Sequence, residues 1–394
     1  MTRVDELKKL RVSYLPYGKQ MIDEEDIQAV LNVLRGDYLT TGPHINQFEK
    51  AMANYVGAKY AVAFSNGTAA LHGACFAAGI SKGDEVITTP MTFAASANCV
   101  LYQGGKVVFA DIDPKTYNID PIEIEKKITG KTKAIIPVDF TGQPAELKEI
   151  VDIAKKHSLI VIEDAAHALG ATYKDIKIGS ISDMTMFSFH PVKHITSGEG
   201  GMIVTNSKKY YEKLLQFRSH GITRDADKLQ ENHGPWYYEM QFLGYNYRMT
   251  DIQAALGTSQ LEKLDMFVEK RKEIVTKYNE AFQNIRQITT PFQNSEGESS
   301  WHLYIIRLNL DELSVGRREI FETLQKQNIG VNVHYIPVHL LPYYQQLDYE
   351  KGSLPNAENL YEEIISLPLF PAMTEQDVAD VIVAVKRIIE AYAK

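Results

Sequence analysis

The sequence predicts an α/β protein in which a large, doubly wound, mostly parallel sheet is followed by a smaller α+β domain. Short apolar runs without polar alternation recur between residues 60 and 206, as expected of strands that are covered on both faces. Helix-like segments separate these runs, which is typical of βα crossovers. The alternation ends near residue 255, and a length of 394 residues suggests two domains. We therefore expect a large domain over residues 1–255 and a small domain over 256–394.

The N-terminal elements are predicted from helix-end signals and apolar runs. Residues 23–35 should form a helix, because Asp23 is a plausible N-cap, acidic residues fill the first turn and Gly36 follows the last one. A second helix is expected over 45–55. Strands are expected at 60–64, 85–89, 107–112, 134–140, 159–165, 184–189 and 201–206, and the helices between them include 67–79, 92–103 and 144–157.

The C-terminal third of the chain has a different pattern. Residues 252–282 look helical, an apolar run follows at 303–310 and a further helix is expected near 315–327. The chain ends in an amphipathic helix, which Thr374 and Asp377 open as a capping box. These segments predict the smaller α+β domain.

Composition and charge argue against several classes of function. The net charge of -8 argues against nucleic-acid binding, which needs a clustered basic face. We find no signal-peptide-like start and no stretch of the ~20 apolar residues that a membrane span needs. Cys75 and Cys99 lie in alanine-rich context and are expected to be buried free thiols, which fits a reducing cytoplasm. Neither has partners at zinc-ligand spacing, so no metal site is expected.

The segment "FSNGTAAL" (64–71) predicts a strand, a short polar turn and the start of a helix. Free N–H groups at a helix N-terminus bind phosphate. Here the small residues Gly67 and Ala69 would let an anion approach, and the hydroxyl of Thr68 would add a donor. An ordinary βα turn with a good N-cap explains the same residues equally well.

The segment "VIEDAAHALG" (161–170) places Asp164 at the end of a very apolar strand. Burying a carboxylate there is costly unless a cation or a hydrogen-bond donor accompanies it. A helix N-cap is the alternative role for this aspartate. His167 follows three residues later, and a lone histidine is more often structural than catalytic.

The segment "SFHPVKHITSGEGG" (188–201) combines polar groups at a strand end with a glycine cluster. Ser188 could donate to an anion or act as a capping hydroxyl. Lys193 lies at the exit of an apolar strand, where partial desolvation would lower its pKa and free the amine as a nucleophile. A surface lysine is the usual alternative. His190 and His194 flank it and fit packing roles as well as functional ones.

These three segments converge on one edge of one predicted sheet, the carboxyl edge at which doubly wound sheets bind ligands. A cofactor with a phosphate, a ring nitrogen that needs an acid partner and an aldehyde that needs a lysine would use all three. Pyridoxal 5'-phosphate has these groups. The glycine-rich fingerprints of NTPases and dinucleotide-binding oxidoreductases are missing, which counts against those enzyme classes.

The chain resembles the sugar aminotransferases of the DegT/DnrJ/EryC1/StrS family, which have the fold-type-I architecture of pyridoxal-phosphate aminotransferases. A cofactor-binding regulator on the same fold is the non-enzyme alternative, but the presence of Lys193 and the lack of a basic DNA-binding segment favour an enzyme. The resemblance covers almost the whole chain, with matching segments "NGTAAL", "TTPMTFAASAN", "DIDPKTYNID", "AIIPVDFTGQPAEL", "VIEDAAHALGATY", "FSFHPVKHITSGEGG", "GYNYRMTDIQAALG" and "VHYIPVH".

This resemblance implies a role for each candidate residue. Lys193 would be the Schiff-base lysine, and Asp164 would pair with the pyridinium nitrogen so that the ring acts as an electron sink. The other cofactor-binding residues would be Gly67, Thr68, Ala69 and Ser188 at the phosphate, Phe93 stacked on the ring, His167 near the ring hydroxyl, and Asn246, which reaches the phosphate of the neighbouring subunit. The last role implies a homodimer with shared active sites.

The resemblance also implies a substrate. Glutamate would be the amino donor. The motifs look most like those of enzymes that aminate C4 of a UDP-4-keto-6-deoxy-N-acetyl-hexosamine (UDP-2-acetamido-2,6-dideoxy-β-L-arabino-hexos-4-ulose) in pseudaminic acid synthesis. Enzymes that form UDP-4-amino-4-deoxy-L-arabinose or another nucleotide-linked amino sugar are the alternative. Arg248 and His220 are candidate substrate-binding residues, whereas surface charge explains Arg218 and Arg224 at least as well. The polar segment 224–239 is a candidate flap over the nucleotide.

Overall fold

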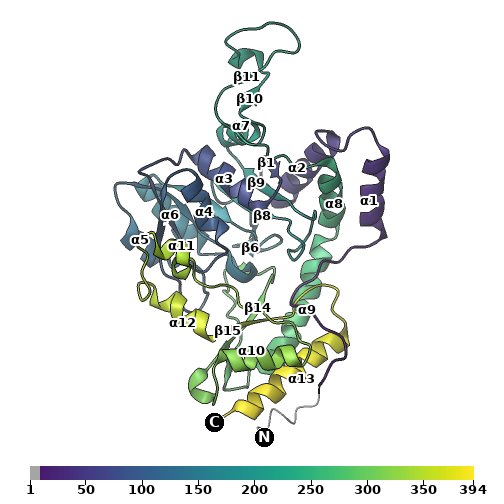
Figure 1. The fold of residues 1–394 in the computed structure, drawn as a ribbon, viewed down its shortest axis with the longest axis vertical. Helices are drawn as coiled ribbons and strands as arrows, with labels where there is room; N and C mark the ends of the chain where they lie inside the picture. The colour runs from purple at the N-terminus through teal and green to yellow at the C-terminus, as the bar shows by residue number, and fades with distance from the viewer. Residues whose placement is uncertain (1–8) are drawn as a thin grey trace.

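The computed structural model describes residues 9–394 and has a seven-stranded sheet at its centre (Figure 1). In sheet order the strands are β1 (Tyr60–Phe64), β9 (Gly201–Thr205), β8 (Met184–Ser188), β5 (Ile160–Asp164), β4 (Thr132–Ile136), β2 (Glu85–Thr88) and β3 (Lys106–Phe109). The last five of these are parallel, and β9 is antiparallel to both β8 and β1. The predicted strands and the mostly parallel sheet are confirmed, although the predicted ends of 107–112 and 134–140 extend past the observed ones.

Both faces of this sheet are covered, because successive side chains of a strand point to opposite faces. Val62 and Phe64 of β1 belong to one apolar cluster, and Ala61 and Ala63 belong to the other. The doubly wound arrangement is therefore confirmed. The helices of this part are α1 (Glu24–Arg35), α2 (Pro43–Val56), α3 (Gly67–Ala78), α4 (Ala95–Tyr102), α5 (Pro121–Lys127), α6 (Leu147–His157), α7 (Lys208–Phe217) and α8 (Asp251–Glu262).

The C-terminal part of the chain lies below the large sheet in Figure 1 and has its own apolar cluster, which also includes Leu15. The predicted helical stretch 252–282 is two helices that meet at Lys263. The expected boundary at 255/256 falls inside α8, and this division stays a prediction. The elements here are an antiparallel sheet of β12 (Ile288–Thr289), β14 (Tyr304–Leu308) and β15 (Ile364–Leu367), with helices α9 (Leu264–Phe282), α10 (Arg317–Lys326), α11 (Pro342–Gln345), α12 (Pro355–Glu363) and α13 (Glu375–Tyr392).

Side-chain caps fix two of the helix starts as the sequence predicts. Asp23 accepts a hydrogen bond from the backbone N–H of Asp26, whose carboxylate accepts in return from the N–H of Asp23. Thr374 and Asp377 form the same capping box at the start of α13. Each reciprocal pair satisfies N–H groups that the first helical turn leaves without an acceptor.

Two short sheets lie outside these layers. One is the pair β10 (Ile222–Thr223) and β11 (Glu239–Met240), and the other contains β13 (Gly297–Glu298), β6 (Thr172–Tyr173) and β7 (Ile176–Lys177). The β10–β11 hairpin, which contains most of the predicted flap, projects from the end of the molecule opposite the two termini (Figure 1). This segment therefore extends away from the body of its own chain.

Two further expectations concern the chain's environment. Cys75 and Cys99 are both buried and free, as predicted. Within residues 9–394, none of the helices combines the length and the apolar character needed to cross a bilayer.

Candidate active site

A cavity of about 950 Å³ opens at the carboxyl ends of β5 and β8, between the large sheet and the segment 332–335. Its volume is in the range of small-molecule sites, and its position is the one that ligands take in doubly wound sheets. Eight of the predicted site residues line it, namely Gly67, Thr68, Ala69, Phe93, Asp164, His167, Ser188 and Lys193. The structure thus brings the three sequence segments together.

One end of the cavity is the N-terminus of α3. Asn66 caps this helix and accepts from the N–H of Ala69, while the N–H groups of Gly67 and Thr68 have no acceptor within the described chain. A Cβ on Gly67 would lie 3.3–3.4 Å from side-chain atoms of Met186 and Ser188, so the turn and Ser188 are in close contact. Free N–H groups with a nearby hydroxyl are suited to bind a phosphate group, and we refer to this turn together with Ser188 as the cradle.

The glycines after Lys193 join its loop to this cradle. A Cβ on Gly201 would come within 2.5–2.6 Å of backbone atoms of Asn66 and Gly67, so only glycine fits where β9 begins. Gly198 has a φ of +80°, in the left-handed region that favours glycine. The cradle and the lysine loop therefore lie directly against each other.

Asp164 lies at the base of the cavity with its carboxylate almost completely buried. It accepts hydrogen bonds from the hydroxyl of Ser96 at 2.6 Å and from the N–H of Ala166 at 3.1 Å. Burial raises the pKa of this carboxyl group, while the bonds from Ser96 and Ala166 and the charge of Lys193 oppose the rise. Asp164 thus has two features at once: its bond with the N–H of Ala166 caps the turn after β5, and its side chain faces the cavity.

Lys193 extends into the same cavity and is partly exposed there. Desolvation lowers its pKa to about 8, with a smaller lowering from Arg271, and Asp164 opposes the shift. Its ε-amine lies 3.4 Å from Nε2 of His302. About a tenth of this amine is therefore uncharged at pH 7, far more than for an ordinary lysine, and the uncharged form is the one that acts as a nucleophile.

The remaining wall presents aromatic and imidazole groups. Phe93 is 63% exposed, which is unusual for a phenylalanine, and its ring faces the cavity near Tyr335. Nε2 of His167 contacts the hydroxyl of Tyr335 at 3.0 Å, and its buried Nδ1 has no partner among the described residues. An apolar ring face and an unused nitrogen are thus available to a flat, polar ligand.

Other predicted residues lie outside this cavity. Asn246 and His220 are exposed, and neither they nor Arg248 line it. Arg218 is not a surface charge, because it donates to Glu49 at 2.5 Å and to the carbonyl of Ala63 at 2.6 Å in a buried ion pair. Arg224 is exposed on the hairpin.

The two histidines beside Lys193 also differ from each other. His190 is exposed at the cavity, whereas His194 is buried and its Nε2 contacts the carbonyl of Ser300 at 3.0 Å. His194 therefore has a structural contact, which is one of the two kinds of role that the sequence analysis allowed for it.

Several residues that line the cavity or bond to one of its side chains were not singled out from the sequence. Ser96 lies within the motif "TTPMTFAASAN", and His334 and Tyr335 lie within "VHYIPVH", so these motifs held a signal. No signal in the sequence pointed to His302, because it directly precedes the apolar run 303–310 in the C-terminal third. The residues that were missed include Tyr17, Ser96, Tyr102, Tyr247, His302, Asn332, His334 and Tyr335.

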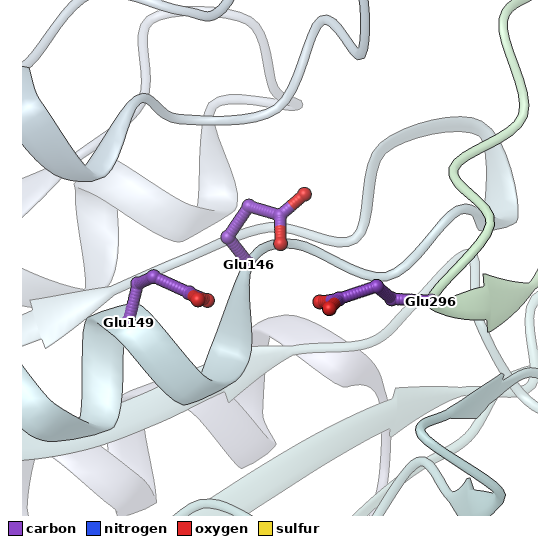
Figure 2. Close-up of side chains that lie close together, drawn as sticks. All are labelled: Glu146, Glu149 and Glu296. Atoms are coloured by element: carbon purple, nitrogen blue, oxygen red, sulfur yellow. The ribbon is translucent and has the colours of Figure 1, made fainter.

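Three carboxylates cluster elsewhere, at Glu146, Glu149 and Glu296 (Figure 2), with oxygen atoms within 4.8 Å of one another. The hydroxyl of Tyr173 lies 3.2–3.4 Å from all three, and Lys174 forms an ion pair with Glu296 at 3.0 Å. These protein groups account for the cluster, and it lies outside the cavity.

Comparison with known proteins now decides the family. The model of the DegT/DnrJ/EryC1/StrS aminotransferase family matches residues 20–386. The chain belongs to this family. Among relatives, it is 45% identical over 382 residues to the Bacillus subtilis spore coat polysaccharide biosynthesis protein SpsC, covering 96% of this chain and 98% of the relative. It is 41% identical over 366 residues to a Campylobacter jejuni UDP-4-amino-4,6-dideoxy-N-acetyl-beta-L-altrosamine transaminase, covering 92% and 94%.

Solved structures of DegT-family aminotransferases have the same fold. Helicobacter pylori PseC, an aminotransferase involved in the biosynthesis of pseudoaminic acid, matches with a TM-score of 0.90 and 35% identity over 96% of this chain and all of its own. The PLP form of the putative sugar aminotransferase Spr1654 from Streptococcus pneumoniae matches with a TM-score of 0.89 and 32% identity over 96% and 99%. The fold-type-I aminotransferase architecture is confirmed.

Pyridoxal phosphate is the cofactor of this aminotransferase family, and the residues of the cavity fit it. The free N–H groups of α3 suit its phosphate, the buried carboxylate of Asp164 suits its ring nitrogen, and the amine of Lys193 suits its aldehyde. The unpartnered Nδ1 of His167 and the exposed ring of Phe93 remain for its hydroxyl and its ring face. The regulator alternative has no support from these comparisons, since the relatives include transaminases.

Proposed function

We propose that this aminotransferase moves an amino group from glutamate to C4 of a UDP-4-keto-6-deoxy-N-acetyl-hexosamine, UDP-2-acetamido-2,6-dideoxy-β-L-arabino-hexos-4-ulose, as a step of pseudaminic acid synthesis. The observation that carries the proposal is a cavity in which a lysine amine, a buried carboxylate and a free helix N-terminus meet, in a chain 41% identical to an altrosamine transaminase. The likeness to PseC supports the same substrate class.

Each group of the cavity has a defined task in this proposal. When bound, pyridoxal phosphate supplies an electron sink for cleavage of a C–H bond. The N–H groups of Gly67 and Thr68 and the hydroxyl of Ser188 would hold its phosphate, and Ala69 would pack beside them. Asp164 would pair with the ring nitrogen. Lys193 would bind the aldehyde of the cofactor, and its free amine would act toward the substrate as a general base and acid.

The active unit we propose is a homodimer with shared sites. Asn246 is exposed and outside the cavity of its own chain, so it is free to reach the phosphate bound by a second copy. Arg248 follows Asn246 by two positions, and the N–H of His220 donates to the carbonyl of Tyr245 at 2.9 Å, so both residues would contact the substrate from the same side. The projecting β10–β11 hairpin would serve as the flap over the nucleotide of the partner, since it extends away from its own chain (Figure 1).

We also propose a cytoplasmic location, because both cysteines are buried and unpaired and the nucleotide sugar and glutamate are both metabolites of that compartment. Reduced thiols at Cys75 and Cys99 in protein isolated under alkylating conditions would support this proposal.

A panel of UDP- and dTDP-linked 4-keto sugars, each offered with glutamate, tests the proposed substrate. The product should be UDP-4-amino-4,6-dideoxy-N-acetyl-β-L-altrosamine, identified by mass spectrometry and by NMR assignment of the configuration at C4. A chain that aminates only the UDP-4-keto-pentose would instead form UDP-4-amino-4-deoxy-L-arabinose. That outcome, or use of another keto sugar as the similarity to SpsC allows, would replace the substrate but keep the aminotransferase.

A further inference from the structure

The segment 299–303 links the C-terminal sheet to the active-site loops. Directly before β14, the N–H of Ser300 donates to the carbonyl of Gly142 and the N–H of Leu303 donates to that of Thr141, both at 3.1 Å. The hydroxyl of Ser300 donates to the carbonyl of His167 at 3.1 Å. Three hydrogen bonds thus fix this segment against the loops that follow β4 and β5.

A buried arginine holds the same segment from the other side. Nη1 of Arg271, on α9, donates to the carbonyls of Trp301 and His302 at 3.3 Å and to that of Leu369 at 2.9 Å. Burial lowers its pKa to about 10, which still leaves the guanidinium charged at neutral pH. The partners of Arg271 within residues 9–394 are these backbone carbonyls and not a carboxylate, so its charge acts on the groups around it.

The imidazole of His302 is buried beside the amine of Lys193. Its Nε2 lies 3.4 Å from Nζ of Lys193, its ring centroid lies 4.3 Å from that of His167, and its buried Nδ1 lacks a partner in the described structure. Burial lowers the pKa of His302 well below its ordinary value, and the neighbouring cations add to the effect. The ring is therefore neutral near pH 7 and can accept from an ammonium group.

We propose that His302 is a positioning residue for Lys193, whose ε-amine it holds whenever that amine is not bonded to the cofactor. The inference rests on the role of Lys193 in the proposed function and adds a partner for its released state. A long lysine side chain loses considerable rotamer freedom when it is fixed, so a defined acceptor keeps the amine within reach of the reacting atoms. Groups that face His302 and Lys193 are His167, His194, Arg271, Asp164 and His334.

Packing is the competing explanation for His302, and substitutions separate the two. His302→Phe keeps a ring and removes the acceptor, whereas His302→Gln places an amide near the position of Nε2. His194→Phe is the matched control, because His194 is equally buried and contacts Ser300 of the same segment, but its side chain has no hydrogen bond to the amine of Lys193.

The test uses the full chain freed of cofactor and two measurements. Competitive acylation with acetic anhydride over a pH series, read by peptide mass spectrometry, gives the titration midpoint of Lys193, with exposed lysines as internal references. The second measurement is the rate at which added pyridoxal phosphate forms a borohydride-reducible adduct on Lys193. Thermal unfolding of each variant checks that it is folded.

We expect His302→Phe to lower the midpoint of Lys193 by about one pH unit, because a hydrogen bond to a charged group contributes that much. At a pH above the midpoints of all variants, where the amine is uncharged in each of them, adduct formation should slow about tenfold in His302→Phe, as expected of a misplaced nucleophile. His302→Gln should stay within about threefold of the parent chain, and His194→Phe should leave the midpoint in place.

Two results would overturn the proposal. One is a titration midpoint of Lys193 and a rate of adduct formation in His302→Phe that equal those of the parent chain. The other is an equal change in all three variants, which would assign the effect to packing of the segment 299–303. A parent chain that forms no adduct on Lys193 would contradict the proposed function instead, while the acylation midpoints would still decide whether His302 holds the amine.

Discussion

The buried pair of Arg218 and Glu49 gives a prediction whose size follows from the structure. The two side chains are 12% and 8% exposed, and they meet at 2.5 Å. Glu49 also accepts from the N–H of Ala63, and Arg218 donates to the carbonyl of the same residue. The pair therefore fixes β1 against α2 and the C-terminal end of α7.

Arg218→Met removes one charge and leaves the carboxylate of Glu49 buried without its cation. Breaking a buried pair in this way costs about 3–5 kcal/mol of folding free energy, whereas removing both charges costs far less. We therefore expect the double variant Arg218→Met/Glu49→Gln to regain at least about 2 kcal/mol over the single variant. Urea unfolding at fixed protein and cofactor concentrations measures both values.

The same variants decide between a structural role and a substrate role for Arg218. A structural role predicts a lower urea midpoint and a KM for the nucleotide sugar close to that of the parent chain. An Arg218→Met protein with parental stability and a strongly raised KM would refute the reasoning and return Arg218 to the substrate-binding candidates.

Further predictions concern the cofactor site and the acidic cluster. Lys193→Ala should abolish turnover, the yellow colour of the bound cofactor and the reducible adduct, and a variant with normal turnover would contradict the site. Adduct formation in the parent chain should rise with pH through a midpoint of about 8, because only the uncharged amine reacts, and Asp164→Asn should lower that midpoint by removing a neighbouring negative charge. Gly201→Ala should lower stability by about 1–3 kcal/mol in urea unfolding and weaken cofactor binding measured by absorbance titration, since its Cβ would clash with backbone at 2.5 Å. Burial and the adjacent carboxylates raise the pKa of Glu146, so its charged form opposes folding and stability is lost as pH rises through that pKa. Glu146→Gln should therefore raise the urea midpoint at pH 8 and change it little at pH 4.

The large sheet and half of the active site could be predicted from the sequence because their signals are local. Continuous apolar runs marked the buried strands, and Asp164 and Ser188 ended two of them. Lys193 lay in the loop that follows Ser188, so the topology of the sheet alone brings these groups to one edge.

The rest of the site depends on contacts between distant segments, which no local pattern encodes. His302 follows Lys193 by 109 positions and meets it only because Arg271 and the loop at 141–142 hold its backbone. The ion pair of Arg218 was equally hard to predict, since nothing in the sequence around Arg218 points to Glu49, which is 169 positions away. Residues 252–282 were predicted as one helical stretch, and the break at Lys263 was missed because no glycine or proline stands between residues 258 and 268 to mark it.

The two walls of the cavity are formed by segments that the ribosome makes at different times. The helix end at Gly67, Ser188 and Lys193 lies within the first half of the chain, while the segment 299–303 and residues 332–335 are made more than a hundred residues after Lys193. A nascent or truncated chain that ends before residue 299 would have all seven central strands but neither His302 nor Tyr335 beside its lysine. Such a chain would keep the helix end, Asp164 and Lys193 at the sheet edge, but the side of the cavity that His302, His334 and Tyr335 form would be open to solvent.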